Sequence, residues 1–206
     1  MRDLIILGTG VHGAEMAEMV ERINRAGPTW RLLGFISPRE DEDRAELNGS
    51  PILGPPEALA AYPDACLLTD NEWPRTIEIP RERLVSLIDP SVCVSRTARI
   101  GPGCVIYPHG YLGLNATLGV QVFCLAGCVI NHDDVLEDRV VLASGVMLAG
   151  GVYVEEDCYL GQGCTVRQHL RIGSGSLIGM GAVVVKDVQP NSVMAGNPAV
   201  RLRERG

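Results

Sequence analysis

The feature that most constrains the fold is a six-residue period that runs from Ile100 to Val184. Of the fifteen positions in this frame, fourteen carry an aliphatic residue, and the exception is Cys124. The residue two places earlier is usually small, and a glycine often follows the aliphatic residue directly. An α-helix needs apolar residues about every 3.6 positions and is weakened by so many glycines. The period therefore predicts a series of short strands.

Six residues per face predict a triangular coil, so we expect residues 91–206 to form an all-β domain, a left-handed parallel β-helix. Five coils would rise about 24 Å, at about 4.8 Å per strand layer. The aliphatic and the small residue point inward, and the glycine is expected to turn the corner with a positive φ. Five cysteines fall in inward slots and are interpreted as packing residues, with a catalytic thiol as the less favoured alternative: Cys104, Cys124, Cys128, Cys158 and Cys164.

Residues 1–90 follow a different pattern, which predicts an α/β domain that is Rossmann-like and binds a nucleotide. The expected elements, in chain order, are a strand over 4–7, a glycine turn over 8–13, a helix over 14–26, and strands over 32–36, 66–68 and 84–88. Amides at the start of such a helix bind phosphate. NAD is the less favoured ligand, because Ser37 and Pro38 stand where an acid would bind its ribose.

The composition excludes several classes of function. The net charge is -7 and the basic residues form no run, so we expect no binding of nucleic acid. The apolar stretch from Leu4 to Leu7 is too short for a signal peptide or a membrane span, which predicts a cytoplasmic protein with no membrane contact. Seven cysteines are an odd number and include no CxxC pair, so the thiols are expected to be reduced.

The repeat, together with the closing segment VMAGNPA at residues 193–199, resembles the hexapeptide acyltransferase superfamily. With its small N-terminal domain, the chain is similar to the PglD/NeuD-like nucleotide-sugar acetyltransferases of bacterial glycan synthesis. The resemblance implies a homotrimer in which acetyl-CoA lies in the groove between neighbouring prisms. It also implies N-acetylation of a UDP- or GDP-linked 4-amino-dideoxy sugar.

His132 is the strongest candidate for the chemistry. It follows the inward Ile130 and should face outward, and a histidine titrates near the working pH of a general base. The resemblance implies that His132 is the catalytic base, that Asp133 raises its basicity, and that the amide of Gly150 stabilises the oxyanion. It also implies that Gln162 and Met180 line the cofactor.

The resemblance further implies that the segment Gly10-Val11-His12 contacts the nucleotide sugar. Ser37 and Thr69 are expected near the same ligand, because they follow strands at the edge where such sheets bind. Many relatives carry a second histidine where this chain has Val141, so a contact to coenzyme A is lost or replaced there.

Three alternatives stay open at this point. The same base could act on a hydroxyl, as in O-acetylation of a sugar or sialic acid. The coil could also be a non-catalytic scaffold whose N-terminal domain senses a nucleotide. A zinc site built on His109, His132 and His169 is disfavoured by their wide spacing, and no metal is expected.

Overall fold

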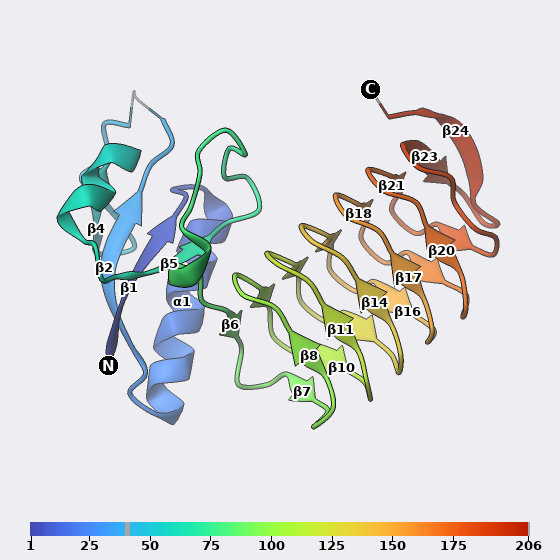
Figure 1. The fold of residues 1–206 in the computed structure, drawn as a ribbon, viewed down its shortest axis with the longest axis horizontal. Coiled ribbons are helices and arrows are strands. Elements are labelled where there is room, and N and C mark those ends of the chain that lie inside the picture. Colours follow the sequence, from blue (N-terminus) through green and yellow to red (C-terminus); the bar gives the residue numbers. More distant parts are fainter. Residues whose placement is uncertain (40–41, 206) are drawn as a thin grey trace. The chain divides into compact units, whose positions relative to one another are not determined.

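The computed structural model describes residues 1–39 and 42–205. The chain divides into two compact units, Met1–Pro90 and Ser91–Gly206. Each is described by itself, and Figure 1 shows the elements of both. No helix among the described residues is long and apolar enough to cross a membrane.

The N-terminal unit is a five-stranded sheet in the order β3-β4-β2-β1-β5. Its elements are β1 (Arg2–Leu7), α1 (Val11–Ala26), β2 (Trp30–Ile36), β3 (Glu46–Leu47), β4 (Ser50–Gly54), η1 (Pro56–Ala61), β5 (Cys66–Thr69), η2 (Arg81–Arg83) and β6 (Leu87–Ile88). Strands β1, β2, β4 and β5 are parallel, and β3 is antiparallel to β4. The strand, glycine turn, helix and strand expected at the start of the chain are therefore present.

The structure does not support the Rossmann-like domain that the pattern predicts. In the described part of the unit, α1 is the only α-helix, and η1 and η2 are short 3₁₀ helices. A doubly wound sheet needs helical crossovers on both faces. Here Pro55, Pro56 and Pro80 begin short helical turns, because proline starts a helix but cannot continue one. What remains is one β-α-β unit, extended by short strands.

The C-terminal unit confirms the predicted left-handed parallel β-helix. Its first face holds β7 (Cys93–Val94), β10 (Tyr111–Leu112), β13 (Val129–Ile130), β16 (Met147–Leu148), β19 (Thr165–Val166) and β22 (Val183–Val184). The second face holds β8 (Arg99–Ile100), β11 (Thr117–Leu118), β14 (Val135–Leu136), β17 (Tyr153–Val154) and β20 (Arg171–Ile172). The third face includes β9 (Val105–Ile106), β12 (Phe123–Cys124), β15 (Val141–Leu142), β18 (Tyr159–Leu160), β21 (Leu177–Ile178), β23 (Ser192–Ala195) and β24 (Val200–Glu204).

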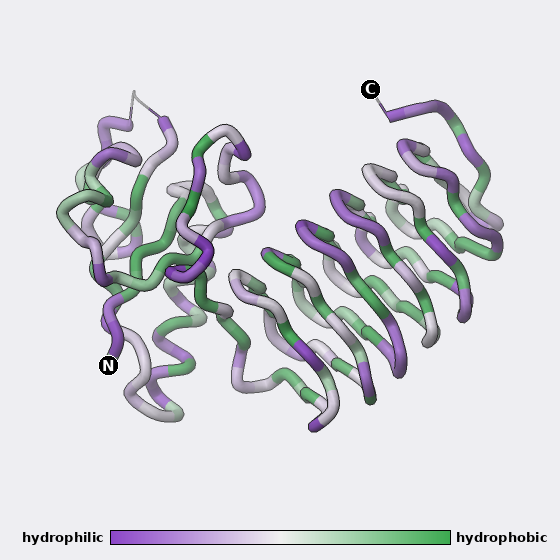
Figure 2. The backbone as a smooth tube through the Cα atoms, viewed as in Figure 1, coloured by the Kyte–Doolittle hydropathy of each residue, from purple (hydrophilic) through white to green (hydrophobic). Residues whose placement is uncertain are grey.

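The core of the coil follows the six-residue period. The aliphatic residue of each frame position from Leu112 onward is buried, and the small residue before it usually is too. Figure 2 shows hydrophobic and hydrophilic stretches alternating along each coil. Cys124, Cys128 and Cys164 are buried, and burial raises the pKa of each thiol. These cysteines pack in the core, as predicted.

The expectation that the frame glycines turn the corners with positive φ is wrong. Positive φ occurs two residues further along, for example at Asn115 (59°) and Asp133 (59°). Gly101 and Gly113 serve a different purpose. A Cβ atom on Gly101 would lie 2.2 Å from the carbonyl oxygen of Gly119. The glycine is required because the backbone of the next coil passes too close for any side chain.

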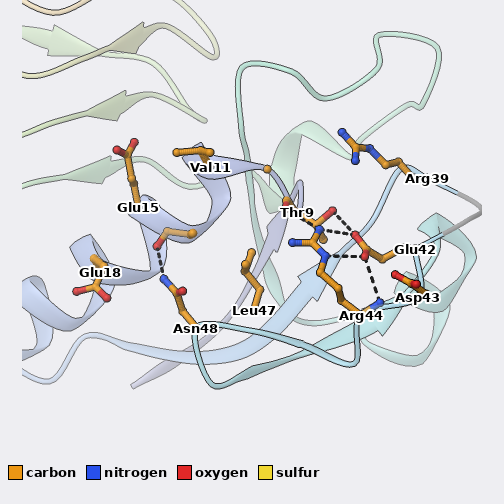
Figure 3. A pocket seen from close by; sticks show the side chains of 12 residues that line it. Thr9, Val11, Glu15, Glu18, Arg39, Glu42, Asp43, Arg44, Leu47 and Asn48 are labelled. Carbon is orange, nitrogen blue, oxygen red and sulfur yellow. Dashed lines mark hydrogen bonds and ion pairs between the residues drawn. The ribbon is translucent and has the colours of Figure 1, made fainter.

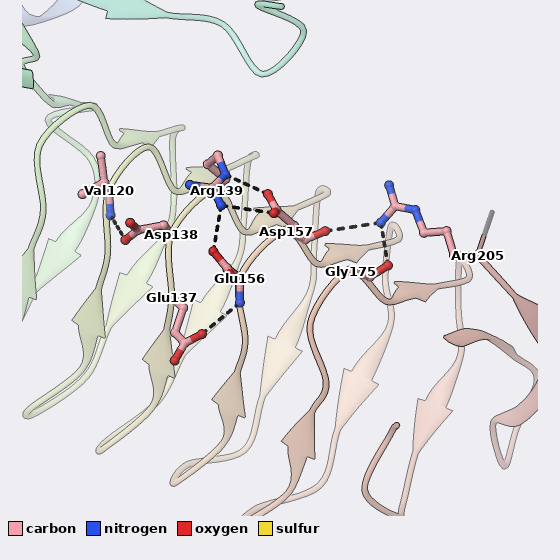
Figure 4. A network of polar contacts seen from close by, with 8 residues as sticks. All are labelled: Val120, Glu137, Asp138, Arg139, Glu156, Asp157, Gly175 and Arg205. Carbon is pink, nitrogen blue, oxygen red and sulfur yellow. Dashed lines mark hydrogen bonds and ion pairs between the residues drawn. The ribbon is translucent and has the colours of Figure 1, made fainter. Parts of the chain in front are cut away.

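One corner of the coil is held by a network of polar contacts between successive layers (Figure 4). The guanidinium of Arg139 donates to Asp157 at 2.8 Å and to Glu156 at 2.8 Å. The carboxylate of Asp157 raises the pKa of Arg139. Asp138 accepts a hydrogen bond from the amide of Val120 at 2.8 Å. Each contact joins a residue to the next or preceding coil and so fixes the register of the stack.

Replacing Gly101 with alanine should destabilise the coil. Its new Cβ overlaps the carbonyl of Gly119, and relieving such overpacking costs about 1–3 kcal/mol. Urea denaturation should report a lower free energy of unfolding by that amount. Gly127→Asn is the matched control, because Gly127 has φ of 72° with no atom near its missing Cβ, and asparagine tolerates this conformation. Equal stability of Gly101→Ala and the wild type would contradict the close-approach explanation.

Candidate functional site

The turn between β13 and β14 carries an outward histidine and two acids. His132 Nδ1 lies 2.9 Å from Asp133 Oδ2, and both side chains are exposed, at 61% and 58%. Since a carboxylate only accepts hydrogen bonds, Nδ1 carries the proton in this pair, and Nε2 of the neutral ring is free to accept another. The pair is therefore arranged as a general base and its orienting acid.

Asp133 is itself held from the preceding coil. The side-chain amide of Asn115 donates to Asp133 Oδ1 at 3.0 Å. This hydrogen bond, followed by the one to His132, lowers the pKa of Asp133. The carboxylate thus stays ionised beside the imidazole and can orient its ring through the hydrogen bond to Nδ1.

Gly150, one coil further on, lies against the histidine ring. A Cβ atom at this position would lie 2.8 Å from His132 Nε2, and Gly150 has φ of 100°, so only glycine fits. The amide of the adjacent Gly151 donates to the His132 carbonyl at 2.9 Å. Among the described residues, no acceptor faces the amide of Gly150. A bare N–H beside a base is suited to bind a developing oxyanion.

Asp134 is a functional candidate that sequence reasoning missed. It occupies an inward slot and is fully buried, although a small neutral residue usually fills that slot. Its Oδ2 accepts the amide of Asn131 at 2.7 Å, and its Oδ1 accepts the amide of Val152 at 2.8 Å. Burial raises its pKa to about 6. The Asp134 carboxylate thus links the His132 turn to the next coil through these two hydrogen bonds. The sequence feature that could have revealed it is a charged residue at an inward position of the repeat.

Gln162 and Met180, the expected cofactor residues, lie elsewhere on the prism. They precede Gly163 and Gly181 at one corner, and the amide of Gly181 donates to the Gln162 carbonyl at 2.9 Å. His132 belongs to the corner that carries Asp133 and Gly151. Both Gln162 and Met180 are exposed. A single coil therefore does not bring these two residues to the histidine.

The glycine turn of the N-terminal unit opens into a pocket of about 580 Å³ (Figure 3). Gly10 and Val11 line it, as expected for a ligand site at the start of α1. His12 is half-buried and its Nδ1 lies 3.3 Å from Glu15 of the same helix. Ser37 and Thr69 are buried, and the Ser37 hydroxyl lies 3.3 Å from that of Thr9. The structure thus brings two of the five expected residues to the pocket wall.

The opposite wall of this pocket was missed by the sequence analysis. Glu42 accepts a hydrogen bond from the Thr9 hydroxyl at 2.9 Å, and Arg44 donates to Glu42 and to the Thr9 carbonyl. The Arg44 hydrogen bond is the main cause that lowers the pKa of Glu42 to about 2. Glu42 therefore places an ionised carboxylate on the pocket wall, where its oxygens are bound to Arg44 and Thr9.

Two more acids lie at the back of the glycine turn. A Cβ on Gly10 would lie 3.5 Å from the Glu72 carboxylate and 3.9 Å from that of Asp70. Burial is the main cause that raises the pKa of Asp70 to about 6. The start of α1 is thus surrounded by carboxylates, which favour hydroxyl and amine donors of a ligand over anions.

Metal ligands do not gather in the described part of the chain, where no three His, Cys, Asp or Glu side chains are placed to hold an ion. His109 and His169 both occupy corner positions with positive φ, and His169 lies against Gly151. His132 and His169 thus lie at one corner, against the adjacent Gly150 and Gly151, and His109 lies at another.

No family model and no curated protein sequence matches the chain. The acetyltransferase domain of PglB from Neisseria gonorrhoeae FA1090 is 27% identical, with a TM-score of 0.84 over 98% of this chain and 100% of that one. Its complex with acetyl coenzyme A gives 26% identity and a TM-score of 0.82, over 98% of this chain and 99% of that one.

A second similar structure is a histidine-to-asparagine mutant of perosamine N-acetyltransferase from Caulobacter crescentus, in complex with CoA and GDP-perosamine. It is 25% identical, with a TM-score of 0.84 over 99% of this chain and 98% of that one. Both neighbours thus match both units of the chain, and both are acetyltransferases.

The buried carboxyl of Asp134 predicts a pH dependence of stability. Its pKa rises from an ordinary 3.8 to about 6 on folding, so the folded state binds more protons between these values. The stabilisation is fully present below about pH 4 and is lost as the pH rises through about 6. Asp134→Asn should therefore flatten the fall in unfolding free energy between pH 4 and 7, as measured by urea denaturation.

A slope unchanged in Asp134→Asn would show that this carboxyl titrates normally. Asp70 has a similar shift, so part of the slope should remain in that variant and disappear when Asp70→Asn is added.

Proposed function

We propose that this hexapeptide-repeat sugar acetyltransferase transfers the acetyl group of acetyl-CoA to the amine of a nucleotide-linked amino sugar. The resemblance predicted from the repeat is confirmed by full-length similarity to the PglB domain and to perosamine N-acetyltransferase. The observation that carries the proposal is the exposed His132–Asp133 pair beside the bare amide of Gly150. A non-catalytic scaffold would not require an exposed histidine–aspartate pair beside a free amide.

The proposed reaction uses His132 as general base. The amine nitrogen attacks the thioester carbonyl carbon while Nε2 of His132 takes its proton, and Asp133 stabilises the resulting imidazolium. The carbonyl oxygen becomes an oxyanion that the Gly150 amide binds. The C–S bond then breaks, and the thiolate of coenzyme A leaves and recovers the proton from His132. Nitrogen thus gains the acetyl group and sulfur gains the proton.

We propose that the N-terminal unit holds the nucleotide sugar and that the coil holds acetyl-CoA. The β1-α1-β2 unit presents Gly10 and Val11 to a pocket of about 580 Å³, a size suited to a nucleoside. His12, Ser37 and Thr69 are assigned to the same ligand as neighbours of the turn. The acid-rich wall supports recognition of hydroxyl and N–H donors, which sugars and bases offer in number.

A homotrimer is proposed for the active assembly. Gln162 and Met180 are assigned to the cofactor but lie at another corner than His132, so two chains are needed to bring these residues together. The outward side chains of the first coil face support self-association, because they are mostly apolar: Cys93, Tyr111, Val129, Met147, Thr165 and Val183. Apolar surface in a continuous row favours burial against another copy.

His132→Ala should abolish most of the activity and leave the fold intact. The change removes the base but not the buried Ile130 and Leu136 on either side. Release of coenzyme A, measured against a panel of UDP- and GDP-amino sugars and sialic acids, should fall by about 10²- to 10⁴-fold. Binding of acetyl-CoA should change little.

The matched control is His109→Asn, which alters an exposed coil histidine at another corner and retains a residue that tolerates positive φ. It should keep full activity. Activity of His132→Ala near that of the control would place the base elsewhere. A wild-type protein that acetylates only hydroxyls in the panel would replace N-acetylation with O-acetylation.

The proposed homotrimer can be tested by the mass of the protein in solution. Multi-angle light scattering should give a mass close to three times the 22.1 kDa of the chain. Met147→Glu places a charge in the apolar row without touching the core, and it should shift the protein toward the monomer and reduce turnover. An active monomer would contradict a site shared between chains.

A further inference from the structure

A second pocket, of about 430 Å³, lies on the coil near its first turns. It is lined by Arg96, Thr97, Ala98, Arg99, Asn115 and Thr117. Arg99 and Thr117 are paired in register on strands β8 and β11, and Thr97 accepts the amide of Asn115 at 2.9 Å. The pocket therefore spans two coils, and the ladder of the β-helix fixes its shape.

The charge of this pocket is opposite to that of the protein as a whole. Its lining contains two arginines and no acid, whereas the chain carries a net charge of -7. In the part of the chain that the structure describes, neither guanidinium has a carboxylate partner. Other coil arginines, such as Arg139 and Arg171, are paired with acids. Two unpaired guanidinium groups beside two hydroxyls and an amide form a site for a phosphate-like anion.

The pocket is connected to the candidate base by hydrogen bonds. Asn115, part of its wall, donates to Asp133, and Asp133 in turn pairs with His132. Arg96 precedes His132 by two coils at the same corner, a rise of about 10 Å at the spacing of strand layers. A group bound by the arginines therefore lies within the length of one substrate molecule from the base.

We infer that this arginine pocket binds a phosphoryl group of a substrate during acetyl transfer. The inference rests on the proposed function for the identity of that substrate, which is either the diphosphate of the nucleotide sugar or the phosphates of coenzyme A. The pocket at the glycine turn is a poor place for this charge. Its lining contains four acids against two arginines, and Arg44 is already bound to Glu42.

The test replaces both arginines in the full-length protein, as Arg96→Gln with Arg99→Gln. Calorimetry is carried out with inorganic pyrophosphate, and with GDP, UDP and coenzyme A, the last three each beside a phosphate-free counterpart: guanosine, uridine and pantetheine. We expect the variant to bind pyrophosphate, and either the nucleotides or coenzyme A, roughly 10- to 100-fold more weakly. Guanosine, uridine and pantetheine should bind as they do to the wild type. If the affinity for the nucleotides falls, the phosphoryl group belongs to the nucleotide sugar, and if the affinity for coenzyme A falls, it belongs to coenzyme A.

The control replaces two exposed arginines of the N-terminal unit, as Arg25→Gln with Arg81→Gln, and removes the same net charge. It should leave all affinities unchanged. Pyrophosphate, nucleotide and coenzyme A affinities that are equal in the arginine-pocket variant and the wild type would overturn the inference, as would a wild type that binds none of them. Failure of the proposed function is a different result, in which the wild type binds pyrophosphate through these arginines but releases no coenzyme A with any sugar.

Discussion

The structure of the C-terminal unit depends on one constraint, the stacking of successive coils at the spacing of a single strand layer. Along most of the coil, a two-residue strand pairs in parallel with the strand 18 residues later, as Tyr111 does with Val129. At this spacing the backbones approach so closely that Gly101 and Gly113 have no room for a side chain. The same repeat places every eighteenth residue at the same corner, so functional groups are stacked in columns.

The candidate site is one such column. Asn115, Asp133 and Gly151 succeed one another at a single corner, and the outward His132 stands beside them. Asp134 links the turn to the next coil from the inside of the prism through two hydrogen bonds. A small neutral residue at this position would pack without the free-energy cost of burying a carboxyl group. The base is therefore held by the solenoid backbone and by a buried acid together, which favours a single ring position.

The two pockets have linings of opposite charge. The pocket at the glycine turn is rich in carboxylates, with Glu15, Glu18, Glu42 and Asp43 in its lining. The coil pocket with Arg96 and Arg99 contains no acid. Each pocket therefore favours a different kind of ligand group: hydroxyl and N–H donors at the glycine turn, and a phosphate-like anion on the coil.

The sequence by itself determined the coil, its inward cysteines and the exposed position of His132, because a period of six is a local property that every face repeats. It also indicated the strand, turn and helix at the start of the chain. It did not reveal that Pro55, Pro56 and Pro80 leave a single β-α-β unit, nor that the frame glycines serve close approach. Only the tertiary structure placed Glu42 beside Thr9, Asn115 beside Asp133 and Arg96 beside Arg99 and Thr117 in one pocket. Glu42 and Thr9 are 33 residues apart with no period to relate them, and their contact arises from loop closure in the first unit. Asn115 and Asp133 are one coil apart, so the period places them at one corner, but the hydrogen bond between their side chains depends on how the coils stack.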